Sequence, residues 1–185
     1  MGELMVRLYT GSGDTGETGL LGPERVSKDD PRVEAMGAVD ELNAVIGVAL
    51  AAQKNRAIRE ALLMIQDDLF TVGAELATAG MRKGTKVPRI TSRHVARLEA
   101  TIGELDVGKV TEFILPRGSE ALARLHWART VARRAERRAV ALSKRDFVSA
   151  DLLRYVNRLS SALYQMAVWV QKRERKRPEH PTYRA

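Results

Sequence analysis

"AIREALLMIQDDLFTVGAELATA", residues 57–79, decides the fold of this chain. Its large apolar residues recur at alternating steps of four and three, at Ile58, Leu62, Ile65, Leu69, Val72 and Leu76. This spacing predicts a helix whose apolar stripe packs against other helices. We therefore expect a helix bundle in which neighbouring helices contribute similar stripes.

The composition agrees with a helical protein. Hydrophobic residues make up 44% of the chain and aromatic residues only 5%, and Ala, Leu, Arg and Glu are abundant. The 185 residues are enough for one domain with a full core. We expect a single domain over 1–185, with a loop at 1–28, a bundle at 29–173 and a basic tail at 174–185 whose order stays open.

Four further helices follow from capping residues, apolar spacing and breakers. We place them from Pro31 to about Gln53, from Thr91 or Ser92 to about Leu105, from Ser119 to about Arg145, and from about Ala150 to Lys172. Residues 4–10 are partly alternating and fit an extended lead-in, but no segment predicts a credible sheet. The count is five helices.

Several classes of protein are excluded or disfavoured. The chain contains no cysteine, which excludes disulfides, thiolate nucleophiles and cysteine-ligated metals. Its Met-Gly-Glu start lacks the charged and then apolar layout of a secretory signal. We find no apolar run that approaches the ~20 residues of a membrane span. These features predict a cytoplasmic protein with no membrane partner.

The formal net charge of +8 predicts an anionic partner. Part of the positive charge lies in the tail, and part lies in "RTVARRAERR", residues 129–138, within a predicted helix. From charge alone, a basic helical bundle that binds nucleic acid through this helix and the tail is one reading. An anionic phospholipid surface and a small phosphate-containing ligand are the other two.

The segment "GSGDTGET", residues 11–18, fits two phosphate-loop patterns in part. The dinucleotide pattern GxGxxG needs a helix at its last glycine, but Gly19, Gly22 and Pro23 forbid that helix. The P-loop pattern needs a lysine after its second glycine, where Glu17 would place a negative charge against the phosphates. Taken alone, these residues leave an ordinary glycine-rich surface loop as the alternative.

The predicted helix from Ser119 carries charged residues beside a stripe of small apolar residues. His126, Arg129, Arg133 and Glu136 share one face at helical spacing. We find no His, Asp and Glu grouping with metal-ligand spacing, so we assign His126 a packing or hydrogen-bonding role.

Asp40 lies in a row of small residues on the predicted helix from Pro31. Gly37, Ala44 and Gly47 complete the row, which lets another helix come very close. A carboxylate buried alone there would be strongly unfavourable, so we expect it to meet a cation, for which the arginine face at 119–145 is the natural source. A solvent-exposed helical acid is the alternative.

Several motifs in a fixed order resemble those of a known family. They are "RLYTGSGDTGETGLLG" from residue 7, "ERVSKDDPRVEAMGAVDELNAVIG" from 24, "FILPRGSEALARLHWARTVARRAERR" from 113 and "LRYVNRLSSALY" from 153. On these motifs the chain resembles PduO-type corrinoid adenosyltransferases (ATP:cob(I)alamin adenosyltransferases) over roughly residues 6–170.

The resemblance implies an all-α five-helix bundle with a glycine-rich N-terminal loop, assembled as a homotrimer with active sites at subunit interfaces. It implies transfer of the 5′-deoxyadenosyl group of ATP to the Co(I) of a reduced corrinoid, giving adenosylcobalamin and triphosphate. ATP and cobalamin would be substrates, Mg²⁺ would be held mainly by ATP phosphates, and a flavin-type reductase would be a partner. Because Co(I) is itself a strong nucleophile, the protein supplies positioning and charge neutralisation rather than a general base.

The resemblance also implies which residues form the site. The residues that match ATP contacts of the family are Thr10, Gly11, Ser12, Gly13, Thr18, Gly19, Lys28, Arg133, Arg134, Ala135, Glu136, Arg137 and Asn157. Asp40 and Arg129 match an ion pair that crosses the subunit interface near the active site. Spacing alone makes Phe113 a core aromatic, but it matches the catalytic, corrinoid-binding aromatic that helps displace the lower axial ligand of cobalamin and leaves a four-coordinate Co(II) corrinoid.

Three positions depart from the family pattern. Gly11 stands where a basic residue is usual, Pro23 stands where a second glycine is common, and Arg117 turns the usual LPGG into LPRG. None of them removes a matched charged residue. Besides the nucleic-acid reading, a non-catalytic ATP-binding regulator or corrinoid carrier stays open as an alternative.

Overall fold

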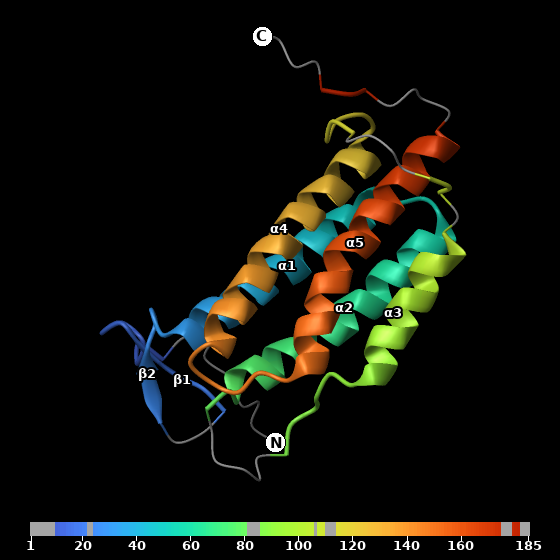
Figure 1. The fold of residues 1–185 in the computed structure, drawn as a ribbon. Helices are drawn as coiled ribbons and strands as arrows, with labels where there is room; N and C mark the ends of the chain where they lie inside the picture. Colours follow the sequence, from blue (N-terminus) through green and yellow to red (C-terminus); the bar gives the residue numbers. More distant parts are fainter. Residues whose placement is uncertain are drawn as a thin grey trace, which may run out of the picture.

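The described part of the chain consists of five helices and one short pair of strands (Figure 1). The computed structural model describes residues 10–21, 24–80, 86–105, 107–109, 114–174 and 179–181. The elements are β1 (Glu17–Gly19), β2 (Arg25–Ser27), α1 (Pro31–Ala52), α2 (Arg56–Ala77), α3 (Ser92–Glu104), α4 (Glu120–Ser143) and α5 (Ala150–Arg173). The predicted helical fold with five helices is confirmed.

Side-chain caps define where the helices begin, because the first amides of a helix have no partner within it. Asp30, Ser119 and Ser149 accept from the second- or third-residue amides of α1, α4 and α5, and Pro31 opens α1. The predicted starts of these helices are confirmed. α2 begins at Arg56, one residue before the predicted start at Ala57, because the Asn55 side chain caps it by accepting from the Ile58 amide at 3.1 Å.

The helices pack so that α4 lies between α1 and α5, while α2 packs on α1 and α3 packs on α5. The six-residue stripe that decides the fold is entirely buried. The buried stripe of α4 consists of small side chains where the neighbouring helices approach. Their exposed fractions are 0–1%, at Ala128, Ala132, Ala135 and Ala139. Small side chains let α1 and α5 come close to α4, and they place the longer polar residues of α4 at the edges of both contacts.

A buried carboxylate joins three of the helices. The Tyr155 hydroxyl on α5 donates to Asp68 Oδ2 on α2 at 2.9 Å, and Arg97 on α3 donates to Asp68 Oδ1. Asp68 is 3% exposed and Tyr155 is fully buried. Burial first, and then the Asp68 charge, raise the pKa of Tyr155 above its ordinary value, so the hydroxyl remains a donor.

The expectation of no sheet is wrong in the N-terminal segment. β1 and β2 pair antiparallel, with Thr18 opposite Val26, and the Lys28 amide extends the contact by donating to the Gly16 carbonyl at 2.8 Å. Each strand has three residues, too few for an alternating apolar pattern to reveal it. The hairpin lies at the end of the bundle where α1 begins and α4 ends (Figure 1).

The expectation of no apolar run long enough for a membrane span is also wrong, by length and composition. α1 is 22 residues long, and its mean hydropathy reaches 1.5 over the relevant window. Ala, Val, Ile and Leu fill most of its sequence. Its buried residues Ala35, Val39, Leu42, Ile46 and Ala49 belong to the bundle core, so in this fold α1 is a core helix.

Candidate active site

The glycine-rich loop folds back on the hairpin through its own backbone. Gly11 and Gly16 adopt φ values of 73° and 85°, which side-chain-bearing residues rarely adopt. The Asp14 amide donates to the Gly11 carbonyl at 3.1 Å, and the Gly16 amide donates to the Gly13 carbonyl at 3.2 Å. The predicted loop residues Thr10 and Ser12 lie together, with their hydroxyl oxygens 2.8 Å apart. The loop is therefore a compact turn.

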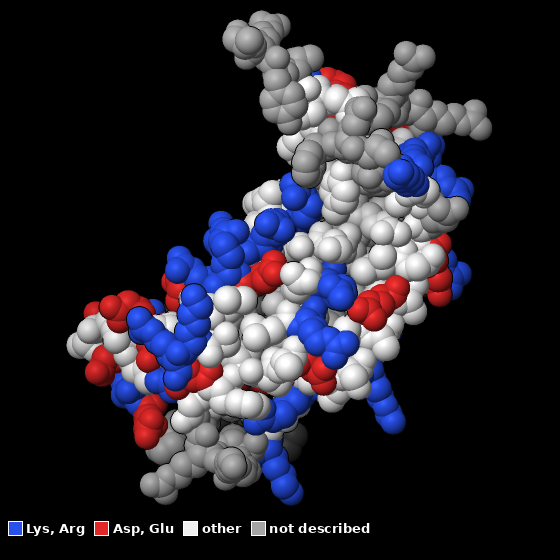
Figure 2. Space-filling model, viewed as in Figure 1, with Lys and Arg blue, Asp and Glu red and all other residues white. Residues whose placement is uncertain are grey.

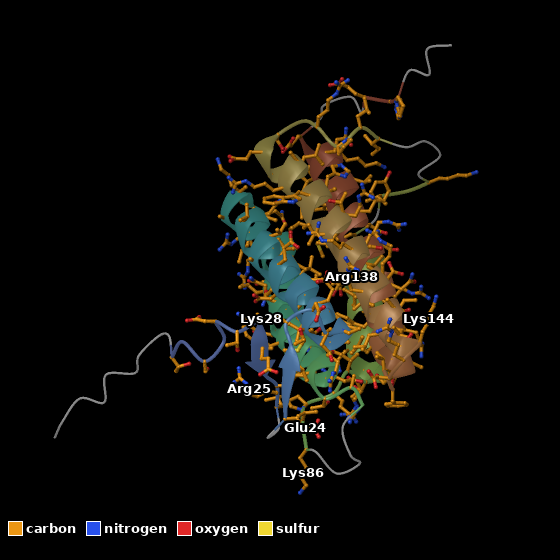
Figure 3. All side chains as sticks on the ribbon, turned by 90° about the vertical axis from the view of Figure 1, so that its left-hand side faces the viewer. Glu24, Arg25, Lys28, Lys86, Arg138 and Lys144 are labelled. Carbon is orange, nitrogen blue, oxygen red and sulfur yellow. The ribbon has the colours of Figure 1, made fainter. Side chains whose placement is uncertain are left out.

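Lys28 reaches across this turn. A Cβ added to Gly13 would lie 3.3 Å from Lys28 Nζ, so the ammonium group lies close to the loop backbone at this glycine. Thr18 and Gly19 lie on β1, and Lys28 directly follows β2, so the hairpin brings these predicted ATP contacts together. Figure 3 shows Arg25 on the hairpin and Lys28 directly after it, near the end of the bundle where Lys144 follows α4.

Arg25 is a loop-holding residue that the sequence did not reveal. Its guanidinium donates to the carbonyl oxygens of Ser12 at 2.6 Å and Glu17 at 3.1 Å, and it forms a salt bridge with the Glu17 carboxylate at 3.5 Å. The sequence carries no local pattern for this role of Arg25, because these contacts depend on the β1–β2 pairing. Glu17, which spoils the P-loop pattern, is thus a partner of Arg25.

Cationic side chains gather along α4 on the face shown in Figure 2. Between α4, α5 and the connections around them lies a cavity of about 490 Å³. It is lined by Val107, Gly108, Ile114, Arg129, Arg133, Ser160, Ser161, Tyr164 and Gln165. The cavity combines two guanidinium groups with apolar and aromatic walls, a chemistry that suits a ligand with both anionic and flat apolar parts.

Arg129 is the half-buried cation of this cavity. Its guanidinium carbon lies 5.8 Å from the centre of the Tyr164 ring, and its Nε is buried without a hydrogen-bond partner among the described residues. A buried N–H without an acceptor is unfavourable, so this group requires an acceptor beyond the described residues. Arg133, one turn further along α4, is exposed at the mouth of the same cavity.

His126 lies one turn before Arg129 and is buried, with 2% of its surface exposed. Neither ring nitrogen has a hydrogen-bond partner in the described chain, and the ring packs 6.1 Å from the Tyr164 ring. Burial, helped by the Arg129 charge, lowers the pKa of His126 to about 4. Of the two roles expected for His126, the structure supports packing, with the ring neutral.

The "RRAER" motif at 133–137 is divided between two sides of α4. Arg134 pairs with Glu41 of α1, whereas Glu136 accepts a hydrogen bond of 2.8 Å from Asn157 Nδ2 of α5. Ala135 is 1% exposed between them, which explains why a small residue stands there. Arg137 is exposed on α4. The motif thus directs Glu136 towards Asn157 and directs Arg134 towards α1.

Asp40 lies on α1 and does not line the α4–α5 cavity. It is exposed and lines a second, largely apolar cavity of about 400 Å³ between α1 and α2, with Gly37, Asn43, Phe70 and Gly73 among its neighbours. Within the described residues, no salt bridge joins Asp40 to an arginine of α4 in the same chain, so the expectation of a cation from this helix stays a prediction. The salt bridges from α1 to α4 come from Glu34 and Glu41, because these residues, rather than Asp40, face α4.

The segment after α5 contacts the connection that leads into α4. The Leu115 amide donates to the Glu179 carbonyl at 2.9 Å, and Arg117 forms a salt bridge with the Glu179 carboxylate. Arg117, the departure from LPGG, thereby acquires a partner. Phe113 and Pro23 lie outside the described residues.

Comparison with known proteins identifies the family. A family model described as "Cobalamin adenosyltransferase" matches residues 8–170. The chain belongs to the cobalamin adenosyltransferase family. The resemblance inferred from the motifs is confirmed, and the loop, the α4 arginines and Asn157 all lie within the matched range.

Two relatives illustrate the similarity. Corrinoid adenosyltransferase PduO of Citrobacter freundii is 48% identical over 163 residues, which cover 86% of this chain and 48% of that protein. A corrinoid adenosyltransferase of Bacillus subtilis is 43% identical over 168 residues, which cover 88% of this chain and 85% of that protein. The chain spans about half the length of the curated PduO relatives it matches.

Solved structures of this family share the fold. A variant of the PduO-type ATP:corrinoid adenosyltransferase from Lactobacillus reuteri, complexed with cobalamin and ATP, matches with a TM-score of 0.89 and 32% identity, covering 95% of this chain and 99% of that chain. Another variant of that adenosyltransferase, complexed with ATP, matches with a TM-score of 0.87 and 31% identity, covering 95% and 100%.

Proposed function

We propose that this chain is an ATP:cob(I)alamin adenosyltransferase. Co(I) of a reduced corrinoid attacks the ribose C5′ of ATP, the bond from C5′ to the triphosphate oxygen breaks, and triphosphate leaves with the bonding electron pair. The cobalt donates two electrons to the new bond and ends as Co(III) in adenosylcobalamin. The observation that carries this proposal is the α4–α5 cavity, where Arg129 and Arg133 meet an aromatic wall in a chain of this family.

The residues of the loop and of α4 suit a triphosphate. Lys28, Arg133 and Arg137 are exposed cations that would neutralise charge on the leaving group as it develops. The backbone of residues 10–13 and 18–19 would enclose the phosphates, and Glu136 with Asn157 would bind the nucleoside part. Arg134 and Ala135 would support the other residues of the RRAER motif, Arg134 through its salt bridge to Glu41 of α1 and Ala135 through its place in the core. We assign all of these residues to one proposed domain, which spans 1–185 and has its helix bundle at 29–173.

Magnesium fits this site as a companion of ATP. Within the described ranges, no three His, Cys, Asp or Glu side chains are grouped so that they could hold a metal ion. We therefore place Mg²⁺ on the phosphate oxygens, where it would add to the charge neutralisation by Lys28 and Arg133.

We further propose a homotrimer in which Asp40 of one subunit pairs with Arg129 of the next. Asp40 is exposed beside a largely apolar cavity, and Arg129 Nε has no hydrogen-bond partner among the described residues. Phe70 at the same cavity is 75% exposed, and a Cβ added to Gly37 or Gly73 would meet nothing within 4 Å in the single chain. Another subunit on this face would cover the exposed apolar surface. It would also explain why glycines stand at two positions where the single chain leaves room for a side chain.

The corrinoid would lie against the apolar part of the α4–α5 cavity, close to Ile114, with the adjacent Phe113 displacing the lower axial ligand. Without that ligand, Co(II) is easier to reduce, and an apolar surface keeps water from replacing it. A flavin-type reductase would supply the electron, and we place the reaction in the cytoplasm.

The direct test of the proposed chemistry identifies the leaving group. The protein is incubated anaerobically with chemically reduced cobalamin, Mg²⁺ and ATP, and the phosphorus products are followed by ³¹P NMR. We expect intact triphosphate to appear only when Co(I) is present. Release of orthophosphate or pyrophosphate independent of the corrinoid would contradict the proposal, and bound ATP without any product would favour a regulator or carrier.

A further inference from the structure

A chain of hydrogen bonds links α3, α5 and α4 through Asn157. Arg158 Nε donates to Glu99 Oε1 of α3 at 2.9 Å, and Arg158 Nη1 donates to Asn157 Oδ1 at 3.1 Å. Asn157 Nδ2 then donates to Glu136 Oε1 of α4 at 2.8 Å. We call these four residues the amide relay. Neither Glu99 nor Arg158 has a place in the site described above.

The relay fixes the orientation of the Asn157 amide. With the amide turned over, its oxygen would face the Glu136 carboxylate and its NH₂ group would face the Arg158 guanidinium, and both contacts would be repulsive. Glu136 and Arg158 therefore both favour the same orientation. A carboxamide has two N–H groups and two acceptor lone pairs, and the relay uses one of each. One donor and one acceptor remain in a defined direction for a ligand.

We propose that Arg158, held by Glu99, is a positioning residue that orients the Asn157 amide for ATP. The proposal rests on the proposed function, because it takes Asn157 as a contact of the nucleotide. The planar guanidinium is suited to the task, since one fork donates to Glu99 and to Asn157 at the same time. An ammonium group keeps the charge of Arg158 but not this fork.

The ion pair between Arg158 and Glu99 is exposed, so changing it can alter ATP binding while the free energy of folding stays nearly the same. The side chains of Arg158 and Glu99 are 47% and 45% exposed. Exposed ion pairs contribute little to the free energy of folding, so a variant of either residue should remain folded. An oriented amide can still matter for a ligand, because a ligand that must first turn the amide binds more weakly.

The test measures ATP binding with Mg²⁺ by calorimetry in the whole chain, without corrinoid. For Arg158→Gln and for Arg158→Lys we expect the Kd for ATP to rise about fivefold, and for Glu99→Gln about twofold, with little change in Tm. Arg154→Gln is the matched control, since Arg154 lies one turn earlier on α5 and, among the described residues, forms its salt bridge with Asp151. We expect wild-type affinity for the control. Wild-type ATP affinity in Arg158→Gln would overturn the proposal.

A charge swap separates positioning from a merely structural role. The double variant Glu99→Arg with Arg158→Glu restores an ion pair between α3 and α5 but gives Asn157 Oδ1 no donor on α5. We expect it to remain as stable as the wild type and to keep the weakened ATP binding. Recovery of full ATP affinity would show that only the ion pair matters and would overturn the proposal.

A second readout does not depend on ATP. The NMR signals of the Asn157 side-chain amide should shift in Arg158→Gln and stay unchanged in Arg154→Gln. Unshifted signals in Arg158→Gln would overturn the relay itself. If the wild-type chain binds no ATP while these signals shift, the relay stands, and what fails is the proposed function together with the role assigned to Arg158 in ATP binding.

Discussion

Asp40 and Arg129 line two different cavities of the same chain, Asp40 between α1 and α2 and Arg129 between α4 and α5. Asp40 is exposed, and the Nε of Arg129 lacks an acceptor within the described chain. The two charges are complementary, and an intersubunit pair would satisfy both. In the proposed homotrimer, this pair would make the subunit interface part of the active site.

The variant Asp40→Ala tests that pair. Removing one partner of a desolvated ion pair leaves the other buried and uncompensated, so we expect kcat/KM to fall by about thirtyfold or more. We also expect a weaker trimer, which dissociates at a higher protein concentration than the wild type does. Light scattering after size-exclusion chromatography measures this change. Glu104→Ala removes an exposed acid of α3 and serves as the control. A fully active Asp40→Ala trimer would rule out the intersubunit pair.

The variant Arg133→Ala tests the nucleotide site. Arg133 is exposed at the mouth of the α4–α5 cavity, where we place a phosphate group. Loss of a charge-assisted hydrogen bond should raise the Kd for ATP by about tenfold or more. Arg138→Ala, a nearby arginine of α4 that pairs with Glu34, is the matched control. Calorimetry that finds equal affinities for wild type and Arg133→Ala would remove Arg133 from the site.

The variant Tyr155→Phe tests the buried carboxylate. It removes the hydroxyl that donates to Asp68 Oδ2 and leaves the Arg97 contact in place. Because the carboxylate then keeps a buried oxygen without a donor, we expect the free energy of unfolding to fall by about 1–3 kcal/mol in urea titrations. A change below about 0.5 kcal/mol would mean that solvent satisfies Asp68, contrary to its burial.

The variant His126→Gln tests the neutral buried histidine. The folded-state pKa of about 4 lies below the ordinary value of 6.5, so between these pH values the unfolded chain binds a proton that the folded chain does not. Stability should therefore fall as the pH drops from 6.5 towards 4. Between pH 7 and pH 5 we expect wild type to lose about 2 kcal/mol more than His126→Gln, compared at equal protein concentration. Parallel pH profiles would show that His126 is protonated in the folded protein.

The fold could be predicted from the sequence because its signals are local. The α2 stripe, the serine caps of α4 and α5 and Pro31 each act within a few residues, and the helix positions followed from them. The hairpin could not be predicted, since three-residue strands carry no period and Arg25 holds the loop only after folding.

The candidate site shows a different limit. Helical spacing groups Arg133 with Glu136, but it does not reveal that Arg134 turns to Glu41 on α1. Spacing also suggested α4 as the source of a cation for Asp40, but it could not say which chain supplies that α4, because periodicity describes one helix and carries no information about which chain faces it. Arg158 escaped notice since its role depends on the neighbouring Asn157 and on Glu99 of a distant helix.

The most direct test of the central claim is an anaerobic absorbance trace of chemically reduced cobalamin mixed with this protein, Mg²⁺ and ATP, followed by exposure to light. The account predicts that the Co(I) bands disappear and that a light-sensitive adenosylated corrinoid forms in their place. Co(I) bands that persist in the presence of protein and ATP would contradict it.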